Sequence, residues 1–398
     1  MVTNTTCSNR IIKMKKIFIV PLLILLSAAS CGDQFKENLI NQDRAEIIRE
    51  ADQYLSTTPR TVVHASSPRS EGGLHDFYSE GDYWWPDTTN LDGPYVRRDG
   101  QTNPDNFIAH RKFMREMSII VPALVVAYDL TGDEKYAAHA MKHLNAWFVD
   151  ADTRMTPSLL YAQAIKGRVT GRGIGIIDTI HLVEVVQAIL KLKELDYLAE
   201  TSLADLKNWF REYLSWLTTH PYGIDERDHG NNHSTCWAMQ VAQFARLVGD
   251  EDQLAFVREM FKTTLLPNQM STEGSFPDEL SRTKPYGYSL FNLDAFTMVC
   301  QIASDPSDNL YEFQTSDGKS LKLGLDYLYP FIETKTSWPL PDDIMYHAEW
   351  PMRHPLLLFG GIEYQRSEYL SQYLSLPRTS KVDEVLRNYF IRQGLLWI

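Results

Sequence analysis

The chain has 398 residues, 44% hydrophobic and 12% aromatic, which is enough to bury a large core in one or two domains. Its formal net charge of −12 argues against nucleic acid as a partner. The composition also excludes a fibrous or disordered chain.

The N-terminus predicts a secretory leader. Lys13, Lys15 and Lys16 precede the apolar run IFIVPLLILLSAAS, which is too short and ends too abruptly for a comfortable membrane span. The sequence AASC that ends this run at Cys31 resembles a bacterial lipobox, in which the cysteine is lipidated and becomes the first mature residue. We therefore expect residues 1–30 to be a signal peptide of the lipoprotein type. An ordinary signal peptide followed by a coincidental cysteine is the alternative.

The mature chain begins at residue 31 on this reading. The leader carries four of the 39 basic residues and none of the 51 acidic ones, so the mature net charge is −16. Cys236 and Cys300 then remain as core thiols, without the spacing of a disulfide framework or a metal site. We expect residues 31–42 to be a polar tether and residues 43–398 a single domain. A lipid anchor at Cys31 would hold it in the bacterial cell envelope, on the periplasmic or outer-membrane face.

Hydrophobic periodicity predicts helices along most of the chain. Residues 43–55 form an amphipathic helix candidate, and residues 57–105 are rich in Pro, Gly, Ser, Asp and aromatics and read as irregular. Sustained strand alternation is scarce, which argues against a parallel-sheet fold. The further predicted helices cover residues 106–130, 133–150, 177–197, 202–219, 232–249, 251–266, 288–303, 319–333 and 380–394.

An internal repeat indicates how these helices pair. The segments LTGDEKYAAHA (residues 130–140) and LVGDEDQLAFV (residues 247–257) each end one helix with Gly and begin the next with acidic residues. Glycine at a helix C-terminus and acids at the next N-terminus favour a tight helical hairpin. We therefore predict an all-α fold, an incomplete (α/α) toroid of hairpins with long loops around a central cleft. An open helical solenoid is the alternative.

The stretch GNNHSTCW (residues 230–237) places two amides and an imidazole at the start of a predicted helix. In isolation, Asn231 or Asn232 is most simply an N-cap and His233 a first-turn residue. The alternative is that the Asn-His pair carries chemistry.

A second stretch, GSFPDELSRTKPYGYSLFNLDAF, brings a cation and hydroxyls close together in the sequence. Arg282 offers a permanently charged fork that suits a carboxylate. Tyr286 and Tyr288 offer hydroxyls that can give or take a proton. Each of these residues, taken separately, also fits a structural role.

Two further stretches combine arginines with aromatic or amide side chains. PSLLYAQAIKGRVTGRGIGIIDT lacks a preceding strand and the GxGxxG pattern, so it is no nucleotide loop. In DYWWPDTTNLDGPYVRRDGQTNPD, exposed aromatics and arginines would stack on sugars and pair with acidic groups; if buried, the tryptophans would anchor the loop. The candidates in the two stretches are Tyr161, Gln163, Arg168, Arg172, Trp84, Trp85, Tyr95, Arg97 and Arg98.

These four blocks, in the order in which they follow one another along the chain, resemble the alginate lyase family of α/α-toroid polysaccharide lyases, over about residues 83–296. The resemblance implies a catalytic domain that cleaves a uronate polymer, mannuronate-rich alginate first, by metal-independent β-elimination that leaves 4,5-unsaturated uronate ends. No cofactor is implied. The family pattern maps its active-site residues onto Asn232, His233, Arg282 and Tyr288. Tyr288 would protonate the leaving oxygen, and the base is either Tyr288 itself or His233.

The expected substrate-binding residues gather positive charge locally on an acidic protein. They include late-chain candidates in MYHAEWPMRH, a stretch that matches the family only loosely. The set is Trp84, Trp85, Arg97, Arg98, Tyr161, Gln163, Arg168, Arg172, Lys284, Tyr286, Tyr346, His347 and Arg353.

Three rival functions remain at the level of sequence. A glycoside hydrolase on the same fold would need two carboxylates, and Asp178, Asp228, Asp278 and Glu349 are available. A lyase acting on glucuronan or another glucuronic-acid polymer would use the same reaction. A non-catalytic glycan-binding lipoprotein would explain the aromatics and the anchor, but not the Asn, His, Arg and Tyr in family order.

Overall fold

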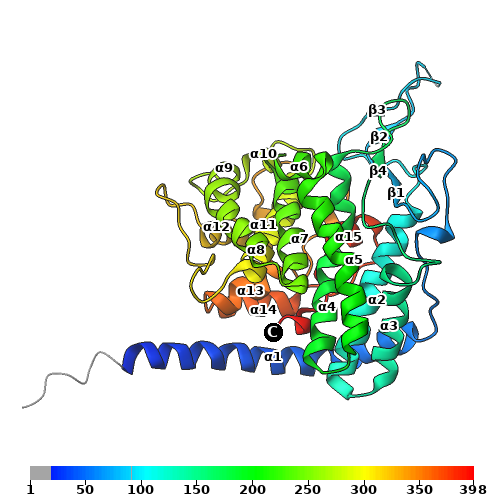
Figure 1. The fold of residues 1–398 in the computed structure, drawn as a ribbon. Coiled ribbons are helices and arrows are strands. Elements are labelled where there is room, and N and C mark those ends of the chain that lie inside the picture. Colours follow the sequence, from blue (N-terminus) through cyan, green and yellow to red (C-terminus); the bar gives the residue numbers. More distant parts are fainter. Residues whose placement is uncertain (1–18, 91) are drawn as a thin grey trace, which may run out of the picture.

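A computed structural model describes residues 19–90 and 92–398, and side chains from residue 32 onward. Residues 1–18, which hold all four basic residues of the predicted leader, lie outside the described residues. The described chain is dominated by helices (Figure 1), and this confirms the all-α prediction.

The first helix, α1 (Ile19–Tyr54), runs across the base of the helical body in Figure 1. The predicted polar tether of residues 31–42 is therefore wrong, because this segment is helical. Its Phe35 and Leu39 side chains are buried in the main core, and they hold the segment on the body. Apolar residues spaced four apart are what a docked helix requires.

The helices of the body follow one another around the fold, and long loops connect several of them. Helix α7 packs against α5, α8 and α11, while α2 packs against α1, α3 and α4. The bounds are α2 (Ala109–Thr131), α3 (Glu134–Phe148), α4 (Leu182–Glu194), α5 (Glu200–Thr219), α6 (Pro221–Arg227), α7 (Asn232–Val248), α8 (Glu251–Met260), α9 (Leu266–Gln269), α10 (Pro277–Leu280), α11 (Pro285–Ala303), α12 (Leu321–Glu333), α13 (Pro355–Glu363), α14 (Ser367–Ser375) and α15 (Asp383–Asn388).

The repeated hairpin signal is confirmed in detail. Gly132 and Gly249 end α2 and α7 with φ angles of 69° and 82°, a left-handed conformation that glycine adopts without steric cost. Asp133 and Asp250 then cap α3 and α8 by accepting backbone N–H groups. These caps turn the chain back on itself within a few residues, as a ring of helical hairpins requires.

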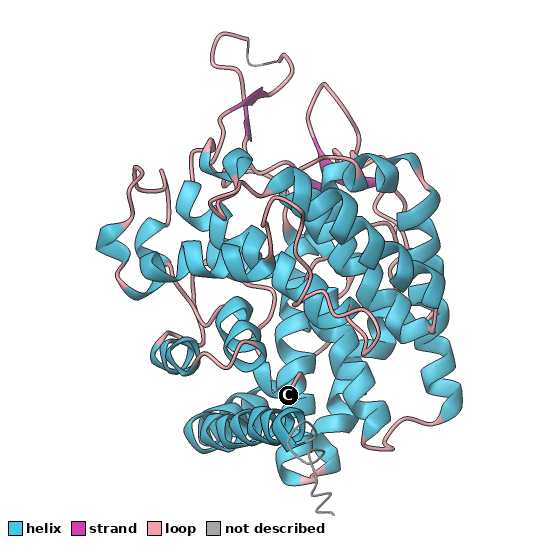
Figure 2. Ribbon diagram, turned by 90° about the vertical axis from the view of Figure 1, so that its left-hand side faces the viewer, coloured by secondary structure: helices cyan, strands magenta, loops and turns pink. Residues whose placement is uncertain are grey.

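In the described part of the chain, four short strands lie at the end of the body opposite α1 (Figures 1 and 2). The strand β1 (Tyr78–Glu80) pairs in parallel with β4 (Tyr161–Ala164), and β2 (Trp84–Trp85) pairs antiparallel with β3 (Val96–Arg97). Short 3₁₀ turns include η2 (Gly173–Thr179) and η5 (His347–Glu349). The predicted irregular region thus folds into loops that border one end of the helical body.

Three predicted helices differ from the structure for identifiable reasons. Residues 380–394 are helical only over α15, because the segment after it leaves the helix and enters the core, where Phe390 and Ile391 are buried. The prediction for residues 251–266 misses the π-turn that follows α8. Residues 177–197 divide into η2 and α4. Helix α13 escapes prediction because it is apolar on every side and shows no periodicity.

Among residues 19–90 and 92–398, no single helix is long and apolar enough to cross a membrane; η2 and α4 pass that test only as a pair bent by 44°. Residues of α4 such as Leu182 and Ile189 are buried in the core. Cys236 and Cys300 are buried in the same core.

Candidate active site

A cleft of about 460 Å³ opens among the loops at the strand-bearing end of the body. Its walls come from segments far apart in the sequence: the β1–β2 loop, β3, η2, and the N-terminal parts of α7 and α11, with α15 completing it. The polar side chains that line it are Asp82, Tyr83, Arg97, Gln163, Arg172, Asp178, His229, Asn231, Asn232, His233, Arg282, Tyr288, Arg387 and Asn388.

The Asn-Asn-His stretch lies at the first turn of α7. Asn231 is the N-cap, and its side-chain oxygen accepts the backbone N–H of His233 at 3.1 Å. The capping interpretation is therefore right for Asn231. Capping leaves Asn232 and His233 at the helix start, where both border the cleft.

Asn232 is held from behind by a buried carboxylate. The amide nitrogen Nδ2 of Asn232 lies 2.8 and 2.7 Å from the two carboxylate oxygens of Glu279, and the Asn232 backbone N–H donates to the same group at 2.9 Å. Burial raises the pKa of Glu279, although the hydrogen bonds from Asn232 oppose that shift. The Asn232 side chain is therefore fixed in orientation before any ligand arrives.

His233 has a carboxylate partner of its own. Its Nδ1 atom lies 2.8 Å from Oε1 of Glu226, a fully buried residue of α6. The ring of His229 makes an edge contact with the ring of His233, at 4.9 Å between centroids. The imidazole is consequently oriented by contacts on one side while it borders the cleft on another.

Arg282 joins the cleft to the loop after β3. Its guanidinium donates to Asp99 at 3.0 and 3.3 Å and to the hydroxyl of Tyr288 at 3.2 Å, and it lies 4.4 Å from the centroid of the Tyr288 ring. Burial raises the pKa of Asp99, but hydrogen bonds and charges from Arg282 and then Arg97 outweigh it and bring the pKa to about 2. Asp99 is therefore ionised and fixes the arginine.

Tyr288 shares its hydroxyl with a second tyrosine. The hydroxyls of Tyr83 and Tyr288 are 2.8 Å apart, and Arg387 of α15 donates to Tyr83 at 3.1 Å. Burial, followed by the neighbouring Tyr83, raises the pKa of Tyr288 well above its ordinary value, against the opposing charge of Arg282. Tyr288 therefore carries its proton at neutral pH.

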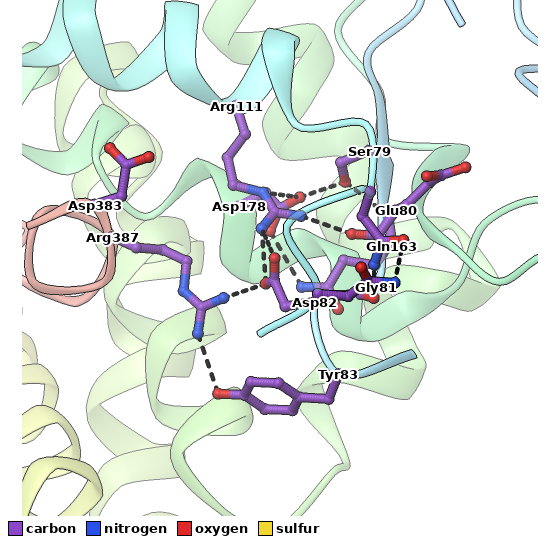
Figure 3. A network of polar contacts seen from close by, with 12 residues as sticks. Ser79, Glu80, Gly81, Asp82, Tyr83, Arg111, Gln163, Asp178, Asp383 and Arg387 are labelled. Carbon is purple, nitrogen blue, oxygen red and sulfur yellow. Dashed lines mark hydrogen bonds and ion pairs between the residues drawn. The ribbon is translucent and has the colours of Figure 1, made fainter. Parts of the chain in front are cut away.

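A buried ion-pair network supports this arrangement (Figure 3). Arg111 of α2 pairs with Asp82 at 2.6 Å and with Asp178 at 3.1 Å, and Arg387 pairs with Asp82 from the other side. Asp178 also accepts hydrogen bonds from Ser79 and Gln163. Because Asp82 precedes Tyr83 directly, the network holds the β1–β2 loop over the cleft.

The adjacent tryptophans have different surroundings. Trp84 lines the cleft, with the guanidinium carbons of Arg168 and Arg172 at 5.1 and 5.9 Å from its ring centroid. Trp85 instead anchors the hairpin: its Nε1 donates to the Gln101 carbonyl, and Arg98 stacks over it at 5.0 Å.

The cleft brings together nine of the residues selected from sequence, namely Trp84, Arg97, Gln163, Arg172, Asn232, His233, Arg282, Tyr288 and the capping Asn231. Arg168 lies just outside it, against Trp84, and Tyr161 of β4 pairs with Tyr78.

Several selected residues lie elsewhere, and their binding roles need correction. Arg353 is buried and pairs with Asp43 of α1, so it fastens that helix to the body. The Tyr286 hydroxyl is buried and donates to the Phe331 carbonyl, and the ring nitrogen Nε2 of His347 pairs with Asp342 at 3.2 Å. None of these three residues lines the cleft.

Lys284 and Tyr346 lie beside the cleft without lining it. The Lys284 ammonium is buried in an ion pair with Glu384 at 2.8 Å, and it lies 5.2 and 5.3 Å from the ring centroids of Tyr346 and Tyr83. The Lys284 ammonium therefore lies between the rings of Tyr83 and Tyr346 and contacts both.

Sequence reasoning did not select Tyr83, Asp99, Glu226, Glu279 or Arg387. Tyr83 stands at the edge of a quoted block, and Glu226 lies in the IDERDH segment just before the Asn-His pair. Proximity to these motifs was the available signal. Arg387 offered none, because it comes from a short helix almost 100 residues after Tyr288.

The four carboxylates available to a hydrolase do not form a pair in the cleft. Of these four, only Asp178 lines the cleft. Its carboxylate is already paired with Arg111 and accepts hydrogen bonds from Ser79 and Gln163. Asp228 is half-exposed or more and pairs with its neighbour Arg227. Two opposed, accessible carboxyl groups, which glycoside hydrolysis needs, are not present among the cleft residues described.

Comparisons with known proteins point to one family. Residues 61–338 match the family described as alginate lyase. An alginate lyase from Bacteroides ovatus has a similar structure, with 30% sequence identity, a TM-score of 0.78, and coverage of 93% of this chain and 98% of that one. No curated protein matches the chain.

More distant structures share the fold. Alginate lyase A1-III from Sphingomonas species A1 matches with a TM-score of 0.54 at 16% identity, over 88% of this chain and 94% of that one. A histidine-to-alanine variant of A1-III complexed with a tetrasaccharide matches with a TM-score of 0.55 at 15% identity, over the same shares of the two chains. The predicted α/α toroid is confirmed by these matches, and the chain belongs to the alginate lyase family of polysaccharide lyases.

Proposed function

We propose that this enzyme cleaves alginate, mannuronate-rich segments first, by β-elimination within the cleft beside α7 and α11. One observation carries the proposal: His233, Arg282 and Tyr288 border one cavity, and the Arg282 guanidinium lies 3.2 Å from the Tyr288 hydroxyl. A proton-transferring hydroxyl and a fixed cation are thereby placed against one another, as elimination next to a carboxylate requires.

The charge of the cleft supports an anionic substrate. Four arginines and two aspartates line it, and both aspartates are already paired with Arg111. Arg97, Arg282 and Arg387 also pair with carboxylates. Arg172 is hydrogen-bonded only to Gln163 in the described structure, so its positive charge remains available to a polyuronate, although the protein as a whole is acidic. Trp84 adds an aromatic surface on which a sugar ring can stack.

Arg282 stabilises the charge that develops during the reaction. Removal of the proton at C5 of a uronate leaves its electrons delocalised into the adjacent carboxylate, which gains negative charge. A guanidinium fixed by Asp99 meets that charge without reorganising. Asn232 holds the neighbouring wall of the cleft in place, with its amide nitrogen directed at Glu279.

We propose that His233 and Tyr288 have separate roles in moving the two protons of the reaction. Burial keeps the Tyr288 hydroxyl protonated, which suits a general acid that gives its proton to the leaving C4 oxygen. His233 then accepts the C5 proton as general base. The C4–C5 double bond forms as the C4–O bond breaks, and no water is consumed.

The test is the absorbance of the unsaturated product. Purified enzyme is incubated separately with poly-mannuronate, poly-guluronate and glucuronan, and the ultraviolet absorbance of the conjugated double bond is followed. We expect the fastest rise on poly-mannuronate and none with Tyr288→Phe. New reducing ends without new absorbance would instead reveal a hydrolase, and binding without turnover would reveal a glycan-binding protein.

We also propose that Cys31 carries a lipid that anchors the enzyme in the bacterial envelope. The lipobox-like AASC sequence supports this, and α1 lies at the end of the body opposite the strands that border the cleft (Figure 1). An anchor at that end would leave the cleft open to a polymer. Metabolic labelling with a radioactive fatty acid should mark the wild type but not Cys31→Ala; equal labelling of both would contradict the anchor.

A further inference from the structure

The imidazole of His233, a catalytic candidate, is hydrogen-bonded to a buried carboxylate that makes no other side-chain hydrogen bond in the described structure. Glu226 is fully buried, and its Oε1 atom lies 2.8 Å from Nδ1 of His233. Its other oxygen, Oε2, is buried without a hydrogen-bond partner in the described part of the chain. The same is true of Oε2 of Glu184, a buried core carboxylate, so an unpartnered oxygen alone does not mark a functional group. What distinguishes Glu226 is that its one side-chain hydrogen bond in the described structure goes to the imidazole of His233, which points to a task at that ring.

The local structure holds Glu226 rigidly. Helix α6 begins with Pro221, and Gly223 lets it approach α5 so closely that an added Cβ would lie 1.9 Å from the Leu217 carbonyl oxygen. His233 is fixed on the other side by the Asn231 cap at the start of α7. The carboxylate and the ring are therefore preorganised from two separate helices.

Burial raises the pKa of Glu226, and the charge and hydrogen bond of His233 oppose that shift. In its ionised form the carboxylate only accepts hydrogen bonds, so the Glu226 contact places the imidazole proton on Nδ1. The Nε2 atom is then left with a lone pair. We infer that Glu226 is a positioning residue that holds His233 in the tautomer whose Nε2 atom accepts the C5 proton, and that it stabilises the imidazolium formed by this transfer. The inference rests on the proposed elimination reaction and adds a residue to it.

Other ionisable groups also face this pair. His229 contacts the His233 ring from the loop between α6 and α7, and Glu279 approaches from α10. Arg172, from the segment before η2, and Asp225 of α6 act on Glu226. Glu226 is the one carboxylate among them that is hydrogen-bonded to His233 in the described structure. Its removal should therefore affect the His233 ring more than removal of any of these other groups.

The direction of that change follows from charge. A negative group beside an imidazolium favours the protonated ring, and Glu226→Gln removes that negative group. The acidic limb of the kcat/KM profile should then move to lower pH. Loss of the fixed tautomer should at the same time reduce kcat by roughly 10- to 100-fold, with little change in KM.

The decisive experiment compares Glu226→Gln and Glu226→Asp with a matched control. Glu184→Gln removes a different fully buried carboxylate, whose Oε1 accepts backbone N–H groups of Arg392 and Gln393 in the core. We expect the control to keep the wild-type kcat and pH profile. Glu226→Asp should recover part of the activity lost in Glu226→Gln. A Glu226→Gln enzyme with wild-type kcat and an unmoved acidic limb would overturn the inference while the proposed function stood.

A second readout does not depend on turnover. Histidine labelled with ¹⁵N in the ring reports which nitrogen carries the proton, and His233→Asn identifies the resonances. We expect an Nδ1–H tautomer at His233 in the wild type and its loss in Glu226→Gln. An Nε2–H tautomer in the wild type would overturn the inference. If no polymer yields unsaturated product, the proposed function fails, and the spectra still decide the role of Glu226 at His233.

Discussion

The hydroxyl of Tyr83 lies 2.8 Å from the hydroxyl of Tyr288 and joins the β1–β2 loop to the first turn of α11 across the cleft. Arg387 donates to the first hydroxyl and Arg282 to the second. Two guanidinium groups thus flank one shared phenolic proton. The acid proposed for the reaction is therefore one member of a four-residue chain, and its properties depend on the other three.

Replacement of Tyr83 by Phe tests this chain. The variant removes a single hydrogen bond to Tyr288, so we expect kcat to fall by roughly 5- to 10-fold, equivalent to about 1 kcal/mol, with KM nearly unchanged. Since Tyr83 raises the pKa of Tyr288, the basic limb of the pH–rate profile should move to lower pH in the variant. Steady-state kinetics across a range of pH values measures both effects.

Tyr136→Phe is the matched control for this variant, because its hydroxyl donates to Asp52 of α1, far from the cleft residues. It should retain the wild-type kcat and pH profile. A Tyr83→Phe enzyme with an unchanged kcat would show that Tyr288 works without its neighbour.

The lowered pKa of Asp99 predicts that the free energy of unfolding falls at acidic pH. Its folded pKa of about 2 lies below the ordinary value of 3.8, so its ionisation stabilises the fold above about pH 4, and the stabilisation is lost as pH falls toward 2. We expect Asp99→Asn to lower the free energy of unfolding by about 1–2 kcal/mol near neutral pH, after allowance for partial exposure. Urea unfolding at about pH 6 and pH 3 should show the gap between the two proteins shrinking; a constant gap would contradict the assignment.

Local sequence patterns were enough to predict the hairpins, whereas the catalytic candidates came from the resemblance to the alginate lyase family. The cap at Asn231 and the left-handed Gly132 and Gly249 depend on neighbours a few residues away, so their spacing already carried the information. The carboxylates behind the Asn-His pair could not be predicted in the same way. Glu279 reaches Asn232 across 47 residues, through packing that no local pattern encodes.

The wrong predictions at Arg353 and at residues 31–42 have the same physical origin. Arg353 carries a charge near aromatic residues in the sequence, and this pattern suggested a substrate contact. In the structure its guanidinium instead pairs with Asp43 on α1, 310 residues earlier. The segment before Asp43 contains many polar residues, and only the docked helix shows that Phe35 and Leu39 share a buried face. Charge and polarity along a chain therefore do not reveal whether a partner from a distant segment neutralises or buries them.

Trp84 and Trp85 should differ in their effect on substrate binding, because Trp84 lines the cleft and Trp85 is fixed in the hairpin. We expect Trp84→Ala to raise KM for polymer by roughly 10-fold with kcat changed less than about 2-fold, as loss of one stacking surface implies. Trp84→Phe should restore most of the affinity. Initial rates over a range of polymer concentrations measure both constants. Trp85→Phe keeps a ring in the hairpin and should leave KM close to wild type; a larger effect there would reverse the assignment.

Tyr286 and Tyr288 are two residues apart on α11, and replacing each by Phe should separate an effect on stability from an effect on catalysis. The Tyr286 hydroxyl is buried against the Phe331 carbonyl, and burial raises its pKa above the ordinary value, so it stays a neutral donor at any working pH. Tyr286→Phe leaves that carbonyl without its donor, and we expect a loss of about 1 kcal/mol in the free energy of unfolding with kcat unchanged.

Tyr288→Phe should show the opposite pattern, with turnover abolished and stability nearly unchanged, because its hydroxyl bonds only within the cleft. Denaturant unfolding and the ultraviolet assay, run on the same preparations, measure both quantities. If Tyr286→Phe lost turnover while Tyr288→Phe kept it, the general acid would have to be reassigned to Tyr286. That outcome would also require the side chain to leave its buried position, because the Phe331 carbonyl now occupies its hydroxyl.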